Sequence, residues 1–470
     1  MPPLRRRPVS SRLPSRLADR LRAAVGRPAV LTDAADCWAY GYDNSRLHAL
    51  PDAVVLAATH EQVAAVVGLC NAAGVPLVAR GRGTGTTGAT VPVRGGVVLS
   101  LERMNRILAI EPRDRIVRVE PGVTNQALQD AVAPHGFFWP PDPTSAAVCT
   151  IGGNLGCNAA GPRAIKYGTT RDNTLGLRAV TGAGEEIRTG VMTTKGVVGY
   201  DFTRLLIGSE GTLAVITEAT LRLTPLPEAR HTLQATYRSV GAAAAAVSAI
   251  MARPVTPCAL EFMDRGAIDM IRGYQDLDLG DEVSALLMIE VDGPRHGLDE
   301  AVDAVAGAAA VEGLIGITRA STAAAAQDLW RARKALSPAL RNVAPKKINE
   351  DVVVPVSQIP ALIDGLGELA ARHGITIVNF GHAGNGNIHV NLLIDPSDAA
   401  ELARAEHCLD GTFDLVLRLG GTLSGEHGIG LVKRDFVRRE IDPVTLRLMR
   451  DVKRQFDPNG ILNPGKSLPA

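Results

Sequence analysis

The chain has 470 residues, more than one hydrophobic core usually supports, so we expect at least two domains. Apolar residues make up 46% and charged residues 21%, as in an ordinary folded protein, and a net charge of +1 gives no reason to expect a nucleic-acid partner. The cysteines are scattered without a CxxC pair, which argues against an iron–sulfur cluster, a zinc ribbon or a disulfide framework. No apolar run approaches the roughly 18–20 residues that a membrane span needs.

The N-terminal segment, MPPLRRRPVSSRLPSRLADRLRAAVG, is rich in arginine and serine and has one acidic residue, Asp19. Two interpretations stay open: a mobile basic tail, which we favour, and a transit peptide for import. We assign residues 1–50 to an N-terminal tail and arm. The expected location is cytoplasmic, with a peripheral place at the inner membrane as an option, and mitochondrial only if the segment is a transit peptide.

From Pro51 the pattern predicts a strand, a helix and a second strand. AVVLAA is a short apolar run. Thr59 can cap a helix that carries apolar residues at helical spacing, and Gly74 can end it. The second strand is VPLVARG, and the helical apolar positions are Val63, Val66, Val67 and Cys70.

Further β-type runs follow, and then the character of the chain changes. GVVLSL, RIVRVEPG and LAVITEATLRL are short apolar runs separated by glycine, whereas LTPLPEAR has two prolines and is typical of a domain boundary. Beyond it, GAAAAAVSAIMA and STAAAAQDLWRARKAL are alanine-rich predicted helices around strands such as ALLMIEV. We therefore predict an α+β fold with a glycine-rich domain at 51–226, a more helical domain at 227–420 and a C-terminal segment at 421–470.

Three glycine-rich stretches fall in the first domain. VARGRGTGTTGATVP follows a predicted strand, and closely spaced glycines let backbone N–H groups approach a pyrophosphate. Alone, this stretch is equally consistent with a plain glycine-rich loop, since neither a Walker lysine nor a Rossmann unit accompanies it. The stretches TIGGNLGCNAAG and GSEGTLAVIT add the same small-residue character and favour a cofactor.

Histidines and an acid gather in two glycine-lined stretches of the second half. GHAGNGNIHVN holds His382 and His389, whose odd separation would put them on opposite faces of one straight strand. Gly384 and Gly386 can bend the chain so that the rings converge. GGTLSGEHGIG then supplies Glu426 beside a further histidine. Two imidazoles and a carboxylate are a ligand set for catalytic Zn²⁺, Mn²⁺ or Fe²⁺.

Together these motifs resemble the FAD-binding fold of the vanillyl-alcohol oxidase / p-cresol methylhydroxylase (PCMH) superfamily. Within it they are most similar to the FAD-linked D-2-hydroxyacid dehydrogenases, which include D-lactate dehydrogenase and the glycolate oxidase FAD subunit. The resemblance runs from about Pro51 to Lys466. It implies a two-domain flavoprotein with a PCMH-type FAD-binding domain and an α+β cap, or substrate, domain. The FAD would lie between the two, and the C-terminal segment would return to the flavin.

The resemblance also implies which residues contact FAD. In the first loop the threonines Thr84, Thr86 and Thr87 stand where some relatives carry an attaching histidine, so we expect the FAD to be non-covalent. The implied contacts are Arg80, Gly81, Arg82, Gly83, Thr84, Gly85, Pro121, Gly122, Asp142, Ile151, Gly152, Asn154, Asn158, Tyr167, Gly168, Glu210, Gly211 and Ile216.

In the similar enzymes the pattern GHxGDGNxH…GEHG carries a divalent metal and a catalytic base. The matching residues here are His382, His389 and Glu426 for the metal, Zn or Mn, and His427 for the base. Asn385 stands where the family often has Asp. The lost charge is expected either to weaken a contact around the metal or to alter metal preference.

Binding of the substrate carboxylate calls for a cation. By the same resemblance we assign Arg333 and Lys347 to substrate binding, and Asn391 to a substrate-facing position. A planar guanidinium suits a carboxylate because it can donate two parallel hydrogen bonds.

The expected activity is oxidation of a D-2-hydroxy acid, D-lactate first, to the 2-oxo acid. The metal would hold the substrate, His427 would take the hydroxyl proton, and the hydride would pass to flavin N5. Alternatives are glycolate or D-2-hydroxyglutarate oxidation, a flavin oxidase of another alcohol without metal, or a non-catalytic flavin-binding subunit of an electron-transfer complex. A metallohydrolase would leave the glycine stretches unexplained. The electron acceptor stays open among quinone, cytochrome and electron-transfer flavoprotein, and a homodimer is possible.

Overall fold

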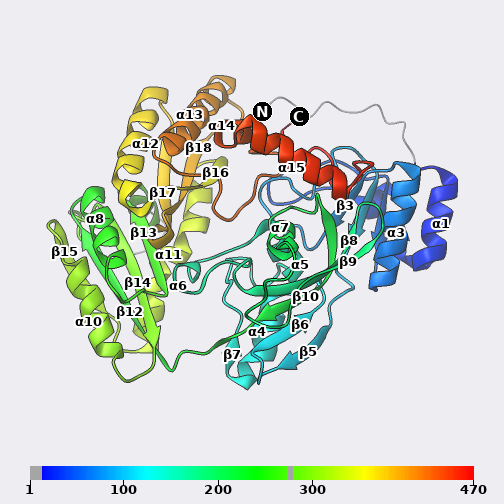
Figure 1. Ribbon diagram of the computed structural model, residues 1–470. Coiled ribbons are helices and arrows are strands. Elements are labelled where there is room, and N and C mark those ends of the chain that lie inside the picture. Colours follow the sequence, from blue (N-terminus) through cyan, green and yellow to red (C-terminus); the bar gives the residue numbers. More distant parts are fainter. Residues whose placement is uncertain (1–12, 274–278, 470) are drawn as a thin grey trace. The chain divides into compact units, whose positions relative to one another are not determined.

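A computed structural model describes residues 13–273 and 279–469, and these residues form two compact units (Figure 1). The first unit holds the described residues up to Gly161, the stretch Gly168–Leu226 and the segment from Glu426 on. The second unit holds Pro227–Gly425 and a short insertion, Pro162–Tyr167. The main part of the second unit begins at Pro227, within the proline-containing stretch LTPLPEAR. It ends at Gly425, five residues after residue 420, where the sequence analysis ended this domain. The insertion was not foreseen.

A small, mostly parallel sheet opens the first unit. Its strand order is β1-β2-β4-β3, with β2, β4 and β3 parallel. Between β2 and β3 runs α3, whose N-cap Thr59 accepts a hydrogen bond from the N–H of Gln62 and whose end is Gly74 at φ 60°. The predicted strand, helix and strand are therefore confirmed. The bounds are β1 Val30–Leu31, β2 Ala53–Leu56, α3 His60–Ala73, β3 Leu77–Arg80 and β4 Val97–Ser100.

The N-terminal segment is helical where the structure describes it. Helix α1 spans Ser15–Val25 and contributes Leu17, Leu21 and Val25 to the core that β2 and α3 also line. The expectation of a mobile tail is wrong for this part, because three apolar residues at helical spacing have a face to bury. Residues 1–12 lie outside the described part of the chain. Short elements follow α1: η1 Arg27–Ala29 and α2 Ala34–Trp38.

A five-stranded antiparallel sheet completes the first unit, in the order β5-β6-β10-β8-β9. Its core includes the fully buried Trp139, whose indole N–H donates to the carbonyl of Asn173 at 3.1 Å. The strands are β5 Ile107–Glu111, β6 Ile116–Val119, β8 Thr174–Thr181, β9 Glu186–Gly190 and β10 Ala214–Arg222, with β7 Phe137–Phe138 paired to β11 Thr224–Pro225. The helices are α4 Asn125–Val132, η2 Ala133–His135, α5 Ile151–Cys157 and α7 Phe202–Leu206.

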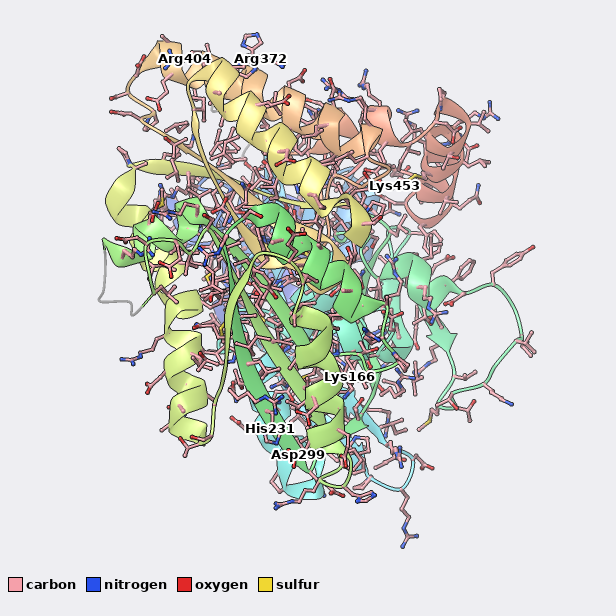
Figure 2. The ribbon with its side chains drawn as sticks, turned by 90° about the vertical axis from the view of Figure 1, so that its left-hand side faces the viewer. Lys166, His231, Asp299, Arg372, Arg404 and Lys453 are labelled. Carbon is pink, nitrogen blue, oxygen red and sulfur yellow. The ribbon has the colours of Figure 1, made fainter. Side chains whose placement is uncertain are left out.

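A lysine of the C-terminal segment bonds to other parts of the first unit. Lys453, labelled in Figure 2, lies on α15 and donates to the carbonyls of Thr212 at 2.6 Å and Leu462 at 3.0 Å, and it pairs with Asp457. Since these partners precede β10 and follow α15, one cation joins distant parts of the unit. The elements of this segment are η5 Arg434–Phe436, α14 Val437–Glu440 and α15 Pro443–Phe456.

The second unit is built on a seven-stranded antiparallel sheet in the order β15-β12-β14-β13-β17-β18-β16. This order brings together segments far apart in the sequence, so that green β13 lies beside yellow-orange β17 in Figure 1. The strands are β12 Ala229–Tyr237, β13 Ala259–Asp264, β14 Ala285–Gly293, β15 Leu314–Arg319, β16 Lys346–Val353, β17 Thr376–His382 and β18 Asn387–Ile394.

Helices cover both faces of this sheet. On one face the hydroxyl of Tyr237 donates to the carbonyl of Ala309 at the end of α10, and at the other end of the same helix Asp299 lies 3.5 Å from His231 of β12 (Figure 2). On the opposite face Ile268 of α9 and Leu336 of α11 pack with sheet residues. The helices are α6 Ala164–Tyr167, α8 Val240–Met251, α9 Arg265–Arg272, α10 Leu298–Ala309, α11 Ala323–Val343, η3 Val356–Gln358, α12 Ile359–His373, η4 Ala383–Asn385 and α13 Ala399–Arg418.

The predicted alanine-rich helices are α8 and α11, and ALLMIEV lies in β14, so the α+β class is confirmed. Within residues 13–273 and 279–469, no helix combines the length and the apolar character required to cross a membrane.

Candidate active site

The first unit contains a pocket whose lining includes five glycines, Gly81, Gly152, Gly153, Gly156 and Gly211. It is lined by the loop after β3, by α5 and by the loop that leads into β10. Of the predicted FAD contacts, those that line it are Arg80, Gly81, Pro121, Gly152, Glu210, Gly211 and Ile216. Leu101 also lines the pocket and was missed, whereas Thr90, Thr150, Gly156, Ser209 and Val215 fall in the three glycine-rich stretches without being named as contacts.

Glycine is required where the pocket segments meet. A Cβ on Gly152 would lie 2.6 Å from the Cβ of Pro121, and one on Gly81 would lie 2.3 Å from Thr150 Oγ1. Thr150 cannot turn away without loss, because its Oγ1 accepts a hydrogen bond from the N–H of Gly153 and caps α5. The pocket can therefore bring backbone close to a flat or extended ligand, as a dinucleotide cofactor needs.

Arg80 stabilises the first glycine-rich loop, which follows β3. Its Nη1 donates to the carbonyl of Tyr42 at 2.6 Å and to Thr90 Oγ1 at 3.1 Å. Gly83 has φ +66°, and a Cβ there would lie 2.3 Å from the Arg80 guanidinium. The carbonyls of Thr84 and Gly85 accept hydrogen bonds from Asn44, while Arg82 lies 3.6 Å from Glu102. These contacts hold the loop in shape.

Eleven of the eighteen predicted FAD contacts do not line the pocket, and five of these eleven lie in its framework. Ile151 is fully buried in the core, Asn154 Oδ1 accepts from Asn125, and Asn158 Oδ1 accepts from the N–H of Arg171. The N–H of Gly122 donates to Met104, and Asp142 packs closely against Gly161. As direct cofactor contacts these five stay predictions.

Tyr167 belongs to the second unit. Its hydroxyl lies 2.9 Å from both carboxylate oxygens of Asp292, to which Lys166 also donates at 2.6 Å. Burial, together with the charge of Asp292, raises the pKa of Tyr167. The hydroxyl is committed to Asp292. Gly168, at φ +79°, begins the return to the first unit.

Glu210 lines the pocket, but its carboxylate turns to the C-terminal segment. It accepts hydrogen bonds from the N–H groups of Ile429 at 2.8 Å and of Gly430 at 2.8 Å, and from the Ser467 hydroxyl. Burial raises the pKa of this carboxyl. A Cβ on Gly428 would lie 2.3 Å from Glu210 Oε1, so the loop after His427 packs directly on this side chain.

The second unit places the two predicted histidine ligands on one face of its sheet. They lie on β17 and β18, which form a hairpin in which His382 pairs with Asn387 and Phe380 pairs with His389. Directly opposed residues share a face, and the two imidazole centroids are 5.2 Å apart. The predicted convergence is confirmed, and the chain changes direction at the predicted glycines. A four-residue reversal produces it, with Gly386 at φ +73°.

Glu426 completes a group of three possible metal ligands. One nitrogen of each histidine and one carboxylate oxygen of Glu426 all lie within 4.8 Å of one another, and both histidines are buried. Glu426 is the first residue past the division between the units, one peptide bond from Gly425. The N–H of Gly425 donates to the carbonyl of Asp351 at 2.9 Å and to its carboxylate at 3.0 Å, so the chain entering Glu426 is fixed to β16. This donor set fits a divalent ion.

A fully buried acid, Glu261 on β13, connects two predicted site residues. Its Oε1 contacts His382 Nδ1, and its Oε2 accepts from Arg333 Nε at 2.9 Å. Burial alone would raise the pKa of Glu261, but the contacts with His382 and Arg333 outweigh it and lower the pKa to about 2. The signal in the sequence was a lone acid in the apolar run ALEFM.

The remaining predicted substrate contacts lie on the same sheet face. Asn391 of β18 stands opposite Asn349 of β16, two residues from Lys347. The amide of Asn391 donates to the carbonyls of Val378 and His389, and its buried Oδ1 has no hydrogen-bond partner among the residues described.

Asn385 is exposed at the tip of the hairpin turn. The carboxylate that contacts His382 comes from Glu261 instead. His427, the predicted base, is partly exposed, and its Nε2 lies 3.9 Å from Glu426 Oε1.

Comparison with known proteins defines the class. Residues 51–190 match the family model of the FAD binding domain, and residues 226–467 match that of the FAD linked oxidases, C-terminal domain. The chain belongs to the FAD-linked oxidases and is an FAD-dependent oxidoreductase. A solved structure of p-cresol methylhydroxylase with substrate bound shares the fold, with a TM-score of 0.78 at 20% identity over 97% of each chain. The predicted PCMH-type two-domain fold is confirmed.

Two relatives indicate which members of the family this chain is similar to. The glycolate oxidase subunit GlcD of Bacillus subtilis is 38% identical over 428 residues, 91% of either chain. The D-lactate dehydrogenase of Anaerostipes hadrus is 35% identical over 427 residues, 89% of this chain and 90% of its own. The resemblance inferred from the motifs is therefore confirmed.

Proposed function

We propose that the protein oxidises a D-2-hydroxy acid, D-lactate first, to the corresponding 2-oxo acid, with D-2-hydroxyglutarate or the achiral glycolate as the alternative substrate. The observation that carries the proposal is the cluster of His382, His389 and Glu426, with His427 next to it, in a chain of the FAD-linked oxidases. Kinship with proteins named for glycolate and D-lactate supports the substrate class.

The pocket of the first unit holds FAD without a covalent bond. Its wall of Gly81, Gly152 and Gly211 admits the cofactor at close range, and the braced first loop needs little rearrangement. Bound FAD supplies the two-electron acceptor for the Cα hydride.

Residues of the cap domain, together with Glu426 of the C-terminal segment, bind and orient the substrate. His382, His389 and Glu426 hold a divalent metal, Zn or Mn, which when bound polarises the substrate oxygens. Arg333 and Lys347 supply positive charge for the substrate carboxylate, and the guanidinium keeps its Nη groups for that purpose because Glu261 takes Nε. Asn391 Oδ1 offers a buried acceptor to the substrate.

His427 takes the proton from the substrate hydroxyl. A neutral imidazole carries a lone pair on one ring nitrogen, which can accept this proton. Its place beside Glu426 in an irregular loop lets one side chain bind metal while the other faces the hydroxyl.

The test is anaerobic flavin bleaching with a panel of D- and L-lactate, glycolate and D-2-hydroxyglutarate. We expect a D-acid or glycolate to bleach the wild-type flavin. His427→Ala should retain FAD and metal yet lose roughly 10²–10⁴ in the rate, the usual scale of general-base catalysis. His407→Ala, a change at an exposed histidine of α13, is the matched control and should keep the wild-type rate.

Near-normal bleaching in His427→Ala would remove its role as base. A yellow, metal-containing wild type that none of these acids bleaches would favour a non-catalytic flavin subunit, a reading consistent with the name of the B. subtilis relative. Quinone, cytochrome and electron-transfer flavoprotein remain the candidate electron acceptors, and a homodimer remains a prediction.

A further inference from the structure

Glu261 stands between the metal ligands and the substrate cation without belonging to either group. It lies directly opposite His382 in the β13–β17 pairing, and it is fully buried. Its two oxygens are divided between two partners: Oε1 meets His382 Nδ1, and Oε2 accepts from Arg333 Nε at 2.9 Å.

The contact with His382 decides which ring nitrogen faces a metal. An ionised carboxylate only accepts hydrogen bonds, so Nδ1 must carry the proton. The lone pair is then on Nε2, and the ring is held in one orientation. Such a carboxylate–histidine contact also raises the basicity of the ligating nitrogen.

The contact with Arg333 fixes the guanidinium in the same way. Glu261 occupies Nε, and the guanidinium carbon lies 4.9 Å from the ring centre of Phe380, which limits its rotation. The Nη groups are therefore presented in one direction, as a fork for a carboxylate requires.

We propose that Glu261 is a positioning residue that aligns His382 toward the metal and Arg333 toward the substrate carboxylate. One buried charge then couples metal affinity to substrate affinity. The inference rests on the proposed function, since it assumes that His382 binds metal and Arg333 binds substrate.

A glutamine cannot replace Glu261 in both roles. Its amide has one acceptor oxygen, so it can accept from His382 or from Arg333 and must direct an N–H toward the other donor. Without its acceptor, His382 or Arg333 should no longer be held in one orientation, because removing one partner of a buried charged pair is strongly destabilising.

The chain offers a matched control in Glu290 on β14. Glu290 is also buried on this sheet face and accepts from Trp330 Nε1 at 2.9 Å and Thr232 Oγ1 at 3.2 Å, but it contacts no predicted ligand. Glu290→Gln therefore makes the same chemical change in a comparable setting and shares no partner with Glu261.

The experiment is a competition titration of Zn²⁺ against a chromogenic chelator, on the purified flavoprotein without substrate. We expect Glu261→Gln to weaken Zn²⁺ binding about 10–100-fold, the usual effect of losing a carboxylate behind a histidine ligand. Glu290→Gln should stay within about twofold, as unconnected sites do. In turnover, Glu261→Gln should also raise KM for the acid at saturating Zn²⁺.

Flavin absorbance and the thermal midpoint check the fold of each variant. If Glu261→Gln does not keep its flavin, Glu261→Asp replaces it, with Glu290→Asp as its control. The shorter side chain keeps the charge but withdraws both oxygens, so its Zn²⁺ affinity must still fall below that of the control.

Wild-type Zn²⁺ affinity in the Glu261 variants, with the wild type binding one ion, would overturn the inference and leave the proposed function intact. An equal loss in the Glu261 and Glu290 variants would also overturn it, by showing a general effect of buried charge. A wild type that binds no Zn²⁺ or Mn²⁺ would overturn the metal site of the proposed function, and this inference with it.

Discussion

In the first unit the pocket is lined in part by glycines that let neighbouring segments approach closely, whereas in the second unit polar side chains meet across one face of a sheet. Around the pocket, a Cβ on Gly81 or Gly152 would collide with a neighbouring segment. On the sheet face, His382, His389 and Glu261 meet through strand register. Gly81 and Gly152 of the pocket leave no room for a side chain, whereas the sheet face depends on side chains that strand pairing brings together.

This difference predicts how each region fails. Added volume at the closely packed glycines should distort the pocket, so that the protein loses its flavin. Arg80 acts there by stabilising the first loop through its hydrogen bonds. A polar face is disturbed by loss of a single group, since the buried partners are left unsatisfied. Changes in one region should therefore leave the other cofactor in place.

The largest effect is expected from the metal ligands. His382→Ala or His389→Ala should keep FAD but slow substrate-driven flavin reduction by roughly 10²-fold or more, because metal polarisation contributes several kcal/mol and each 1.36 kcal/mol is a factor of ten. Stopped-flow absorbance of the flavin, with elemental analysis of each variant, measures both.

Chelation of the wild type should reproduce this behaviour, and Zn²⁺ or Mn²⁺ should restore the rate. His407→Ala again serves as control. Flavin loss in either ligand variant would break the comparison, because it would mean that the two cofactors depend on the same residues. Full-rate reduction by a metal-free preparation would make the histidine cluster structural.

A smaller effect is expected at Gly156, which lines the pocket. A Cβ there meets no protein atom within 4 Å, so Gly156→Ala should fold normally and place its methyl group in the pocket. We expect FAD affinity to fall about tenfold, equivalent to 1–2 kcal/mol of overpacking. Reconstitution of the deflavinated protein with FAD, followed by fluorescence, measures it.

Gly367→Ala is the control, since Gly367 lies within α12 of the second unit and its Cβ also meets nothing within 4 Å. Both changes favour helix, so neither should lower the thermal midpoint of the flavin-free protein. Equal FAD affinity in the two variants would show that the cofactor does not approach the Gly156 backbone.

The pocket was readable from the sequence because its signals are local. Each glycine stretch carries its own chemistry within about ten residues, and the strand, helix and strand around Thr59 follow from periodicity and capping alone. The histidine motif was equally local, which is why His382, His389 and the change of direction between them could be predicted.

What the sequence could not supply are contacts set by register and long-range packing. Glu261 is 121 positions from His382, and only the β13–β17 pairing brings them together. The bond between the Tyr167 hydroxyl and Asp292, and the bonds of the Glu210 carboxylate to the C-terminal segment, were likewise not predicted. No local pattern encodes such partners.

The smallest effect is expected at the helix caps. Substitutions there test whether release of the flavin depends on the stability of the first unit alone. Thr59 caps α3 in the first unit and Ser239 caps α8 in the second, each accepting one backbone hydrogen bond. Replacing either by alanine should cost about 1 kcal/mol, or about 2–4 °C in the midpoint for units of this size. Thr59→Ala should lower the temperature at which flavin fluorescence is released, because α3 leads into the strand before Gly81. Ser239→Ala should lower only the transition seen by circular dichroism. If both variants shift flavin release equally, the units unfold together and the pocket draws its stability from the whole chain.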